Sequence, residues 1–262
     1  MTKQKHHYMK TRILTIALLA ASLLTACKQG LSGEITTEET GIKPDYEVVK
    51  VKGYARVTVN LESRVVSTET DKNLQKYVKI KQKGKTLIID ASNSHIKDAV
   101  DENGERLVCI AIPYCTAFDG LRMEGSSTFD FEMMLSPNIK ITTNGNNIIT
   151  GPVTCETIKI KSSGSDQILI DVNCDKIDLE MTGNCTAGTL MIPLACSEAN
   201  CHLTGTCTAY VEAGMTRGMV EDDSELHYIG DQECRAKSSG SARIINDRDR
   251  EPMDITRIPR KL

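Results

Sequence analysis

The chain contains no Trp, and its seven Tyr and three Phe make up only 4% of 262 residues. So few aromatic rings argue against a carbohydrate-stacking site and against a sandwich core built on a buried Trp. Basic charge is scarce too: the formal net charge is −3, whereas nucleic-acid-binding proteins usually carry a net basic face. Ten Cys are too sparse for a disulfide scaffold. Hydrophobic residues nevertheless reach 40%, enough to bury a real core.

The N-terminus has the pattern of a targeting segment. Lys3, Lys5, Lys10 and Arg12 precede an apolar run from Ile13 to Leu24. That run is 12 residues long, short of the ~20 that span a membrane, so it predicts a secretory signal peptide. Its end, Leu24-Thr25-Ala26-Cys27, resembles a bacterial lipobox. We therefore expect residues 1–26 to be removed and Cys27 to be lipidated, so that the protein's partner is the membrane. Stable anchoring of this kind needs more than one acyl chain.

The segment after this leader is polar and acidic. Removing residues 1–26 takes away four basic residues and no acid, so the remainder has a formal charge of −7. It has no polybasic patch for anionic lipid, which leaves the anchoring to the acyl chains. Residues 27–45 are rich in Gly, Ser, Thr and Glu, and this composition predicts a flexible tether.

The body of the chain is repetitive. After a β-rich part from Tyr46 to Pro113, small-residue turns recur with centres 20, 19, 19, 22, 18 and 17 residues apart. The centres are Gly125, Gly145, Gly164, Gly183, Gly205, Asp223 and Gly240. Asp223 replaces Gly in this series, and Asp tolerates a left-handed turn.

The flanks of each turn keep the same register. Four residues before the centres lie Leu121, Ile141, Ile160, Leu179, Cys201, Met219 and Ala236, and four after lie Phe129, Ile149, Ile168, Ala187, Ala209, His227 and Ile244. Such alternation gives two short strands per repeat, and stacked repeats bury their inner faces. The pattern predicts an all-β fold: a right-handed, β-helix-like β-solenoid with rungs of about 20 residues, preceded by the β-rich N-terminal part. A β-sandwich of hairpins explains the spacing but not the recurring slots.

Cysteines recur in two slots of the repeat. Cys155 and Cys174 lie ten residues after their centres, and Cys185 and Cys207 lie two after theirs. They are small core hydrophobes in one interpretation. In the other, adjacent rungs ~4.7–4.9 Å apart place both pairs within disulfide range in an oxidising envelope. The segment Cys196 to His202 matches no zinc pattern, and no metal or other cofactor is expected.

Catalytic signatures are lacking as well. The acidic group Glu221, Asp222, Asp223, Glu225 and Asp231 could supply some Ca²⁺ ligands, but a solvated acidic turn explains it better. Asp166 and Asp171 are five apart in a strand, which puts them on opposite faces. His227 occupies an inward slot that suits a core histidine. No nucleophile elbow, P-loop or dinucleotide fingerprint is present, so the sequence does not predict an enzyme.

One known family has this order of segments. The relevant stretches are Val49 to Gly53, Leu87 to Ile89, Val108 to Pro113, the small-Gly-Ser turns, Leu226 to Gly230 and Lys237 to Ile244. Together they resemble the bacterial putative auto-transporter adhesin, head GIN domain family over about residues 46–246. The resemblance implies a two-part β-solenoid, secreted or lipid-anchored, in a two-membrane envelope, and it supplies no catalytic residues. The charged residues 247–262 then form a tail that caps the last rung or hangs free.

We therefore expect a non-catalytic envelope lipoprotein whose solenoid surface serves binding or adhesion, held at the outer membrane on its periplasmic face or at the cell surface. Lys140, Lys159 and Lys161 form one exposed basic row on that surface. The ligand, glycan or protein, is open, and nucleic acid is not expected. Two alternatives stay open: a polysaccharide-acting β-helix enzyme of the envelope, and a structural lipoprotein without a ligand.

Overall fold

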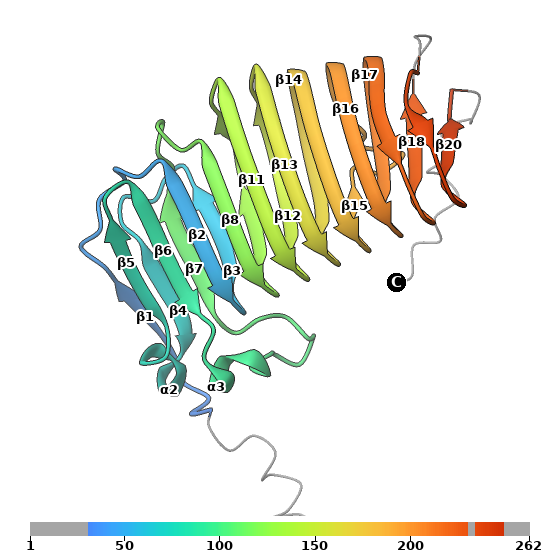
Figure 1. The fold of residues 1–262 in the computed structure, drawn as a ribbon. Helices are drawn as coiled ribbons and strands as arrows, with labels where there is room; N and C mark the ends of the chain where they lie inside the picture. Colours follow the sequence, from blue (N-terminus) through green and yellow to red (C-terminus); the bar gives the residue numbers. More distant parts are fainter. Residues whose placement is uncertain (1–30, 230–233, 249–262) are drawn as a thin grey trace, which may run out of the picture.

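The computed structural model describes residues 31–229 and 234–248. It confirms the all-β prediction: 61% of the chain is strand and 4% is helix. The strands form a β-solenoid of about 6 turns whose rungs are about 19 residues apart (Figure 1). Because the repeat is stacked in register, strands from successive rungs pair in parallel.

The solenoid has two long walls. The front wall, facing the reader in Figure 1, runs β5 (Lys79–Lys83), β6 (Thr86–Ala91), β2 (Val48–Gly53), β8 (Gly120–Gly125), β11 (Asn138–Gly145), β13 (Thr157–Gly164), then the second halves of β14 (Gln167–Gly183), β16 (Leu194–Gly205) and β17 (Thr208–Val220), and β19 (Lys237–Ser238). The back wall runs β1 (Ile35–Glu39), β4 (Ser67–Asp71), β7 (Cys109–Pro113), β3 (Arg56–Asn60), β9 (Thr128–Phe131), β12 (Ile148–Thr154), the first half of β14, β15 (Thr186–Ala187), the first half of β17, β18 (Glu225–Ile229) and β20 (Arg243–Asn246). The short strand β10 (Met134–Leu135) pairs with the end of β12.

The N-terminal part continues the solenoid, but in an order that differs from the chain. Strands β2 and β3 form a rung between the β8–β9 rung on one side and the β6–β7 rung on the other. The chain leaves that rung through the antiparallel strands β4 and β5 and two one-turn helices, α2 (Lys72–Gln75) and α3 (Ser94–Lys97). It then returns past its own first rung to begin β8.

The structure corrects the expected flexible tether over residues 31–45, while residues 27–30 of that segment lie outside the described part of the chain. Residues 35–39 form β1, which pairs antiparallel with β4 along its whole length. The Gln75 amide donates to the Thr36 carbonyl at 2.8 Å, and the Gly33 N–H donates to the Asp71 carboxylate at 2.7 Å. An exposed sheet edge invites pairing with other chains, so β1 protects the outer edge of β4.

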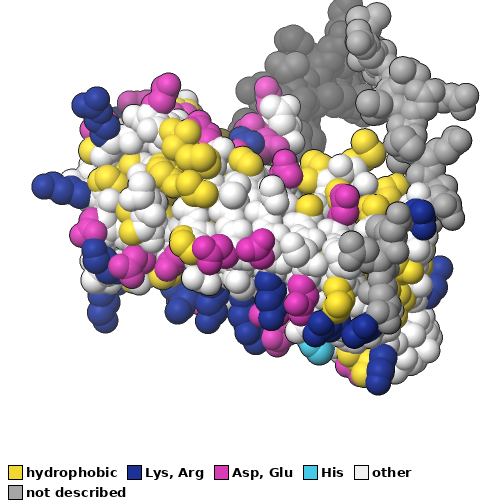
Figure 2. Space-filling view, turned by 90° about the horizontal axis from the view of Figure 1, so that it is seen from above, with side chains coloured by type: hydrophobic (Ala, Val, Ile, Leu, Met, Phe, Trp, Pro, Cys, Tyr) yellow, Lys and Arg dark blue, Asp and Glu magenta, His cyan; other side chains and the backbone are white. Residues whose placement is uncertain are grey.

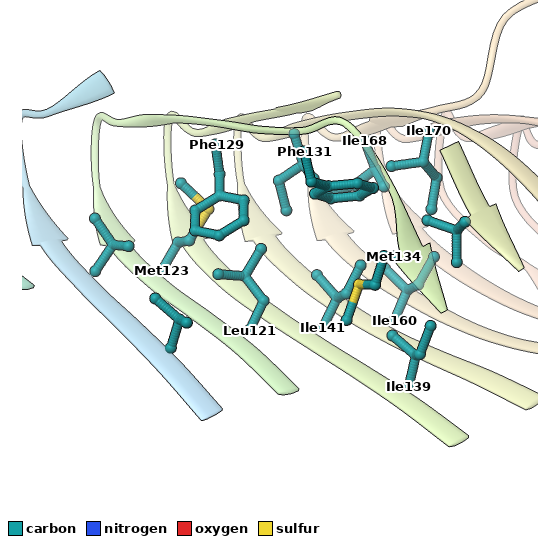
Figure 3. Close-up of a cluster of buried hydrophobic side chains, with 14 of the residues drawn as sticks. Leu121, Met123, Phe129, Phe131, Met134, Ile139, Ile141, Ile160, Ile168 and Ile170 are labelled. Carbon is teal, nitrogen blue, oxygen red and sulfur yellow. The ribbon is translucent and has the colours of Figure 1, made fainter. Parts of the chain in front are cut away.

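Two ladders of apolar side chains fill the space between the walls (Figure 3). The front ladder consists of Leu87, Val49, Leu121, Ile141, Ile160, Leu179 and Cys201. The back ladder consists of Ile110, Val57, Phe129, Ile149, Ile168, Ala187, Ala209 and Leu226. Every member is at most 1% exposed. The repeat slots therefore predict most of the core. The sixth repeat is the exception, because Gly218 and Leu226 take the positions predicted for Met219 and His227, each one residue earlier in the chain.

Glycine turns stack at one edge where the front wall passes into the back wall. The N–H after each glycine donates to the glycine carbonyl of the rung before, as from Asn146 to Gly125 at 2.8 Å and from Ser165 to Gly145 at 2.7 Å. In the sixth turn Asp222, with φ 59°, takes the glycine position. The register of β16, β17 and β19, continued by two residues, aligns it with Gly205 and Gly240, and the Asp223 N–H donates to the Gly205 carbonyl at 2.9 Å. The prediction of Asp223 was wrong by one residue, because the spacing between the fifth and sixth turns is shorter than the spacing between the fourth and fifth.

A polar ladder lines the inside of these turns, two residues after each glycine position. Its members are Ser127, Asn147, Asp166, Cys185, Cys207 and Ser224, all at most 3% exposed. The Asn147 backbone N–H and side-chain amide both donate to Asp166 Oδ1, at 2.7 and 2.8 Å. The Ser127 N–H donates to Asn147 Oδ1, and the Cys207 N–H to Ser224 Oγ. These bonds satisfy buried amides that the turn leaves without a strand partner.

We predict that Gly145→Ala strongly destabilises the protein. A Cβ there would lie 2.0 Å from the Gly125 carbonyl oxygen, at φ 137°. Urea unfolding should show a loss above about 3 kcal/mol. Gly84→Ala is the matched control, since Gly84 also has a positive φ but no neighbour within 4 Å, and it should cost only about 1–2 kcal/mol. Equal losses would show that stacking of the turns contributes nothing.

We also predict that Asp166→Ala costs about 2–3 kcal/mol, because it leaves the buried donors of Asn147 without their acceptor. Asp171→Ala removes an exposed carboxylate from the same strand and should stay within about 0.5 kcal/mol of the parent. Chemical denaturation of both variants checks this, and an Asp166→Ala variant as stable as Asp171→Ala would contradict it.

Candidate functional site

The outer face of the front wall carries an excess of positive charge over its first rungs. The outward side chains of β2, β8, β11 and β13 include six cations, Lys50, Lys52, Arg122, Lys140, Lys159 and Lys161, and one carboxylate, Glu124. Lys and Arg side chains gather along the lower edge of Figure 2, where the front wall of Figure 1 is seen edge-on. This concentration stands out in a chain whose formal net charge is −3.

Half of these cations form salt bridges with neighbouring carboxylates. Glu124 contacts Lys50 Nζ at 2.8 Å and Lys52 Nζ at 3.3 Å, and the two ammonium groups hold the pKa of its carboxyl below the usual range. Glu180 pairs with Lys161, and this contact lowers the pKa of Glu180 in the same way. Within the described part of the chain, Arg122, Lys140 and Lys159 have no salt-bridge partner.

The three unpaired cations surround a groove of about 340 Å³, here called the basic groove. Its lining comprises Val48, Asp119, Gly120, Arg122, Asn138, Ile139, Lys140, Thr157 and Lys159. Gly120 lies in register between Val48 and Lys140. It has no side chain to fill its place on the outer face, so a notch opens there beside Lys140.

The sequence predicted part of this surface. Lys140 and Lys159 are in register on neighbouring strands, as their repeat slots indicate, and Lys161 lies on the same face two residues further along β13. The sequence missed Arg122, Lys50 and Lys52. Arg122 occupies the same repeat slot as Lys161, three residues before the turn glycine, so the spacing contains the signal that could have found it. The place of Lys50 and Lys52 beside it depends on the reversed order of the N-terminal rungs, which no repeat spacing encodes.

The four predicted disulfide cysteines form two adjacent pairs. Cys155 and Cys174 lie in neighbouring rungs, and Cys174 is also in register with Cys196, which the repeat spacing missed. A hydrogen bond with the Cys155 thiol, together with burial, raises the pKa of Cys174, while the same bond lowers the pKa of Cys155. Burial raises the pKa of Cys196 to about 12.

The second pair, Cys185 and Cys207, belongs to the polar ladder. The Cys207 thiol donates to the Gly183 and Thr204 carbonyls, and the Ser162 hydroxyl donates to the Cys185 sulfur at 3.2 Å. A hydrogen bond with Cys185, together with burial, raises the pKa of Cys207. All of these thiols are free in the structure, so both disulfides stay predictions.

The remaining candidates are dispersed. His227 does not occupy the predicted inward slot, which Leu226 fills, and it lies on the outer face of the back wall. It is 4% exposed because it stacks on Tyr210, with Nδ1 2.6 Å from Asp247 and Nε2 3.3 Å from Glu225. The Asp222 carboxylate accepts the Gly205 N–H at 3.0 Å, as expected of a turn. Cys201 is buried while His202 is exposed on the other face. Among residues 31–229 and 234–248, no group of three or more His, Cys, Asp and Glu could hold a metal ion, and Asp231 lies outside them.

A larger groove of about 710 Å³ lies at the other edge of the walls, lined in part by Cys174, Cys196, Asp175 and Glu212. Its two carboxylates are the nearest approach to the acid pair of a polysaccharide-acting enzyme. A glycosidase needs one carboxyl kept protonated by a desolvating pocket, whereas Asp175 and Glu212 are both exposed. The groove therefore does not favour catalysis.

We predict that oxidation joins Cys174 to Cys155 or to Cys196, but never to both, because one sulfur forms one disulfide. Non-reducing peptide mapping after treatment with oxidised glutathione should recover these alternatives and the Cys185–Cys207 pair. Cys201, whose strand partners are Leu179 and Gly218, should stay a free thiol as the internal control. Complete alkylation of all these thiols after unfolding would contradict the prediction.

Comparison with solved structures shows that other proteins share this fold. A crystallised putative adhesin from Bacteroides fragilis is 16% identical and superposes with a TM-score of 0.66 over 82% of this chain and 98% of that one. A putative lipid binding protein from Parabacteroides distasonis is 18% identical, with a TM-score of 0.61 over 82% and 97%. A putative adhesin from Parabacteroides merdae is 15% identical, with a TM-score of 0.60 over 82% and 96%.

No match is found among curated proteins. The family model described as "Putative auto-transporter adhesin, head GIN domain" matches residues 45–232, which is most of the solenoid. The chain therefore belongs to the "Putative auto-transporter adhesin, head GIN domain" family.

Proposed function

We infer that the protein is a non-catalytic lipoprotein of the bacterial cell envelope that presents its solenoid for adhesion. The observation that carries this proposal is the front wall, where outward side chains of consecutive rungs stand in register over a rigid sheet. Extended surfaces of stacked repeats suit the binding of large partners. Membership of an adhesin family and similarity to solved putative adhesins support the same function.

The anchor in this proposal is the lipidated Cys27. Cys27 lies outside the described residues. Within those residues, no helix is long and apolar enough to cross a membrane. Because β1 begins at Ile35, only residues 28–34 separate the lipidated residue from the solenoid. An extended segment of that length reaches about 25 Å at most, so the β1 end of the solenoid is held close to the bilayer.

Cell fractionation tests the anchor. Cys27→Ala should move the protein from the membrane fraction to the soluble fraction, since the acyl chains have no other attachment site. Cys109→Ala removes a half-buried thiol of the solenoid and should leave the protein with the membrane. A Cys27→Ala protein that still sediments with membranes would refute lipid anchoring, and protease treatment of intact cells then shows on which face the anchored protein lies.

Adhesion is tested with the full-length chain immobilised from non-ionic detergent. Surfaces coated with folded protein should retain bacterial or host cells saturably, and surfaces coated with heat-unfolded protein should not. Equal retention on both surfaces would contradict adhesion. Release of reducing sugar ends from a retained polysaccharide would favour the enzyme alternative instead.

A further inference from the structure

We propose that the basic groove binds an anionic polysaccharide, with Arg122, Lys140 and Lys159 contacting its carboxylate, sulfate or phosphate groups. The proposal rests on the adhesive function inferred above and specifies the chemical class of the ligand.

The first argument is the arrangement of charge. Lys140 and Lys159 are directly opposite each other on neighbouring parallel strands. Like charges in that position destabilise a sheet. Asp178 lies opposite Lys159 on β14 but contacts Lys176 instead, at 3.8 Å, and neither Lys140 nor Lys159 forms a salt bridge within the described part of the chain. By contrast, Lys50 and Lys52 on the same wall share a salt bridge with Glu124, and Lys161 forms one with Glu180. Three exposed cations left without partners around one groove provide charge that an anionic ligand can use.

The second argument is shape. The missing side chain of Gly120 lowers the surface between Arg122 and Lys140, and the flanking Asn138 and Thr157 add hydrogen-bonding groups. Asp119 is the one carboxylate of the lining. Burial, and to a lesser extent the charge of Glu47, raises the pKa of Asp119, because both disfavour its ionised form. The groove therefore presents three cations against one half-buried acid.

The third argument concerns the spacing of the cations. Adjacent rungs place equivalent side chains ~4.7–4.9 Å apart, which is close to the length that one sugar residue adds to an extended polysaccharide. Lys140 and Lys159 occupy equivalent positions on adjacent rungs, whereas Arg122 lies on the rung before them and two residues further along its strand, because the partner of Lys140 there is Gly120. A chain with one acidic group per sugar can therefore place successive groups on Lys159 and Lys140 and continue over the notch at Gly120 beside Arg122.

Two other ligand classes fit less well. A neutral glycan would need aromatic side chains for stacking, and the outward positions of β2, β8, β11 and β13 carry none. A membrane surface would need exposed apolar side chains beside the cations. The large exposed apolar residues of the described chain are Ile35, Leu61, Val100, Met133, Leu135, Met191 and Ile192, and none lines the groove.

The experiment measures binding of the full-length chain, in non-ionic detergent, to polygalacturonate and dextran sulfate by biolayer interferometry. The test variant is R122Q/K140Q/K159Q. The matched control is K79Q/K81Q/K83Q, which removes the same charge from exposed positions of β5. We expect the test variant to bind roughly tenfold or more weakly than the parent, since each charged hydrogen bond contributes to affinity, and the control to change less than about twofold.

Salt provides a second readout. Raising the ionic strength from about 0.1 M to 1 M shortens the screening length from about 10 to 3 Å, so binding to both anionic polymers should be lost. Circular dichroism must show the parent fold in both variants. Where R122Q/K140Q/K159Q does not fold, the single variant K159Q, tested in the same assay, decides the outcome.

Several results would overturn the proposal. Equal weakening in test and control variants would show diffuse attraction without a site. Binding of uncharged dextran as strong as that of the charged polymers would remove the role of the cations. Binding of anionic phospholipid vesicles or of DNA, but of neither polymer, would assign the groove to another ligand class. Cells retained by a chain that binds neither polymer would refute this inference and leave the adhesive function standing.

Discussion

The structure depends on one constraint, the stacking of backbone upon backbone at the glycine turns. In each turn, the N–H of the residue after the glycine donates to the glycine carbonyl of the rung before. The donors of this series run from Ser126 in the first turn to Thr206 in the fifth, and their hydrogen bonds are 2.7–2.8 Å long. This approach leaves no room for a Cβ, and a positive φ is required at the same position. Once these turns are fixed in line, the register of both walls follows, because one rung cannot slip without breaking its turn.

Register in turn decides what lies inside. Front and back ladders of Leu, Ile, Val and Cys meet across a narrow interior, and Phe129 and Phe131 are among the largest side chains accommodated there (Figure 3). The scarcity of aromatic residues therefore reflects the shape of the core. The polar ladder at the turns, centred on Asp166, satisfies the amides that the narrow turns bury. Cys185 and Cys207 occupy the same ladder, which explains their spacing without requiring a disulfide.

The same register builds the outer surface. Because every rung repeats the alternation, residues far apart in the chain, such as Lys50 and Arg122, become neighbours on the front wall. Charge is then concentrated on the first rungs, while the later rungs of the same wall carry acids beside bases, as in the Lys176–Asp178 and Arg217–Glu198 pairs. A protein with net negative charge can in this way carry a cationic face.

The repeat spacing alone determined the solenoid, most of its core slots and the pairing of Lys140 with Lys159, because each is a local consequence of residues about 19 positions apart. It could not place Asp222, Leu226 or Cys196, since rungs of unequal length shift the register by a residue that only strand pairing reveals. It also missed the order of the N-terminal rungs and the strand β1, because long-range pairing where the chain doubles back past its own first rung leaves no period in the sequence. The cations of the basic groove do follow the repeat slots, but only the side-chain contacts show which of them lack a salt bridge and that Gly120 leaves a notch beside them.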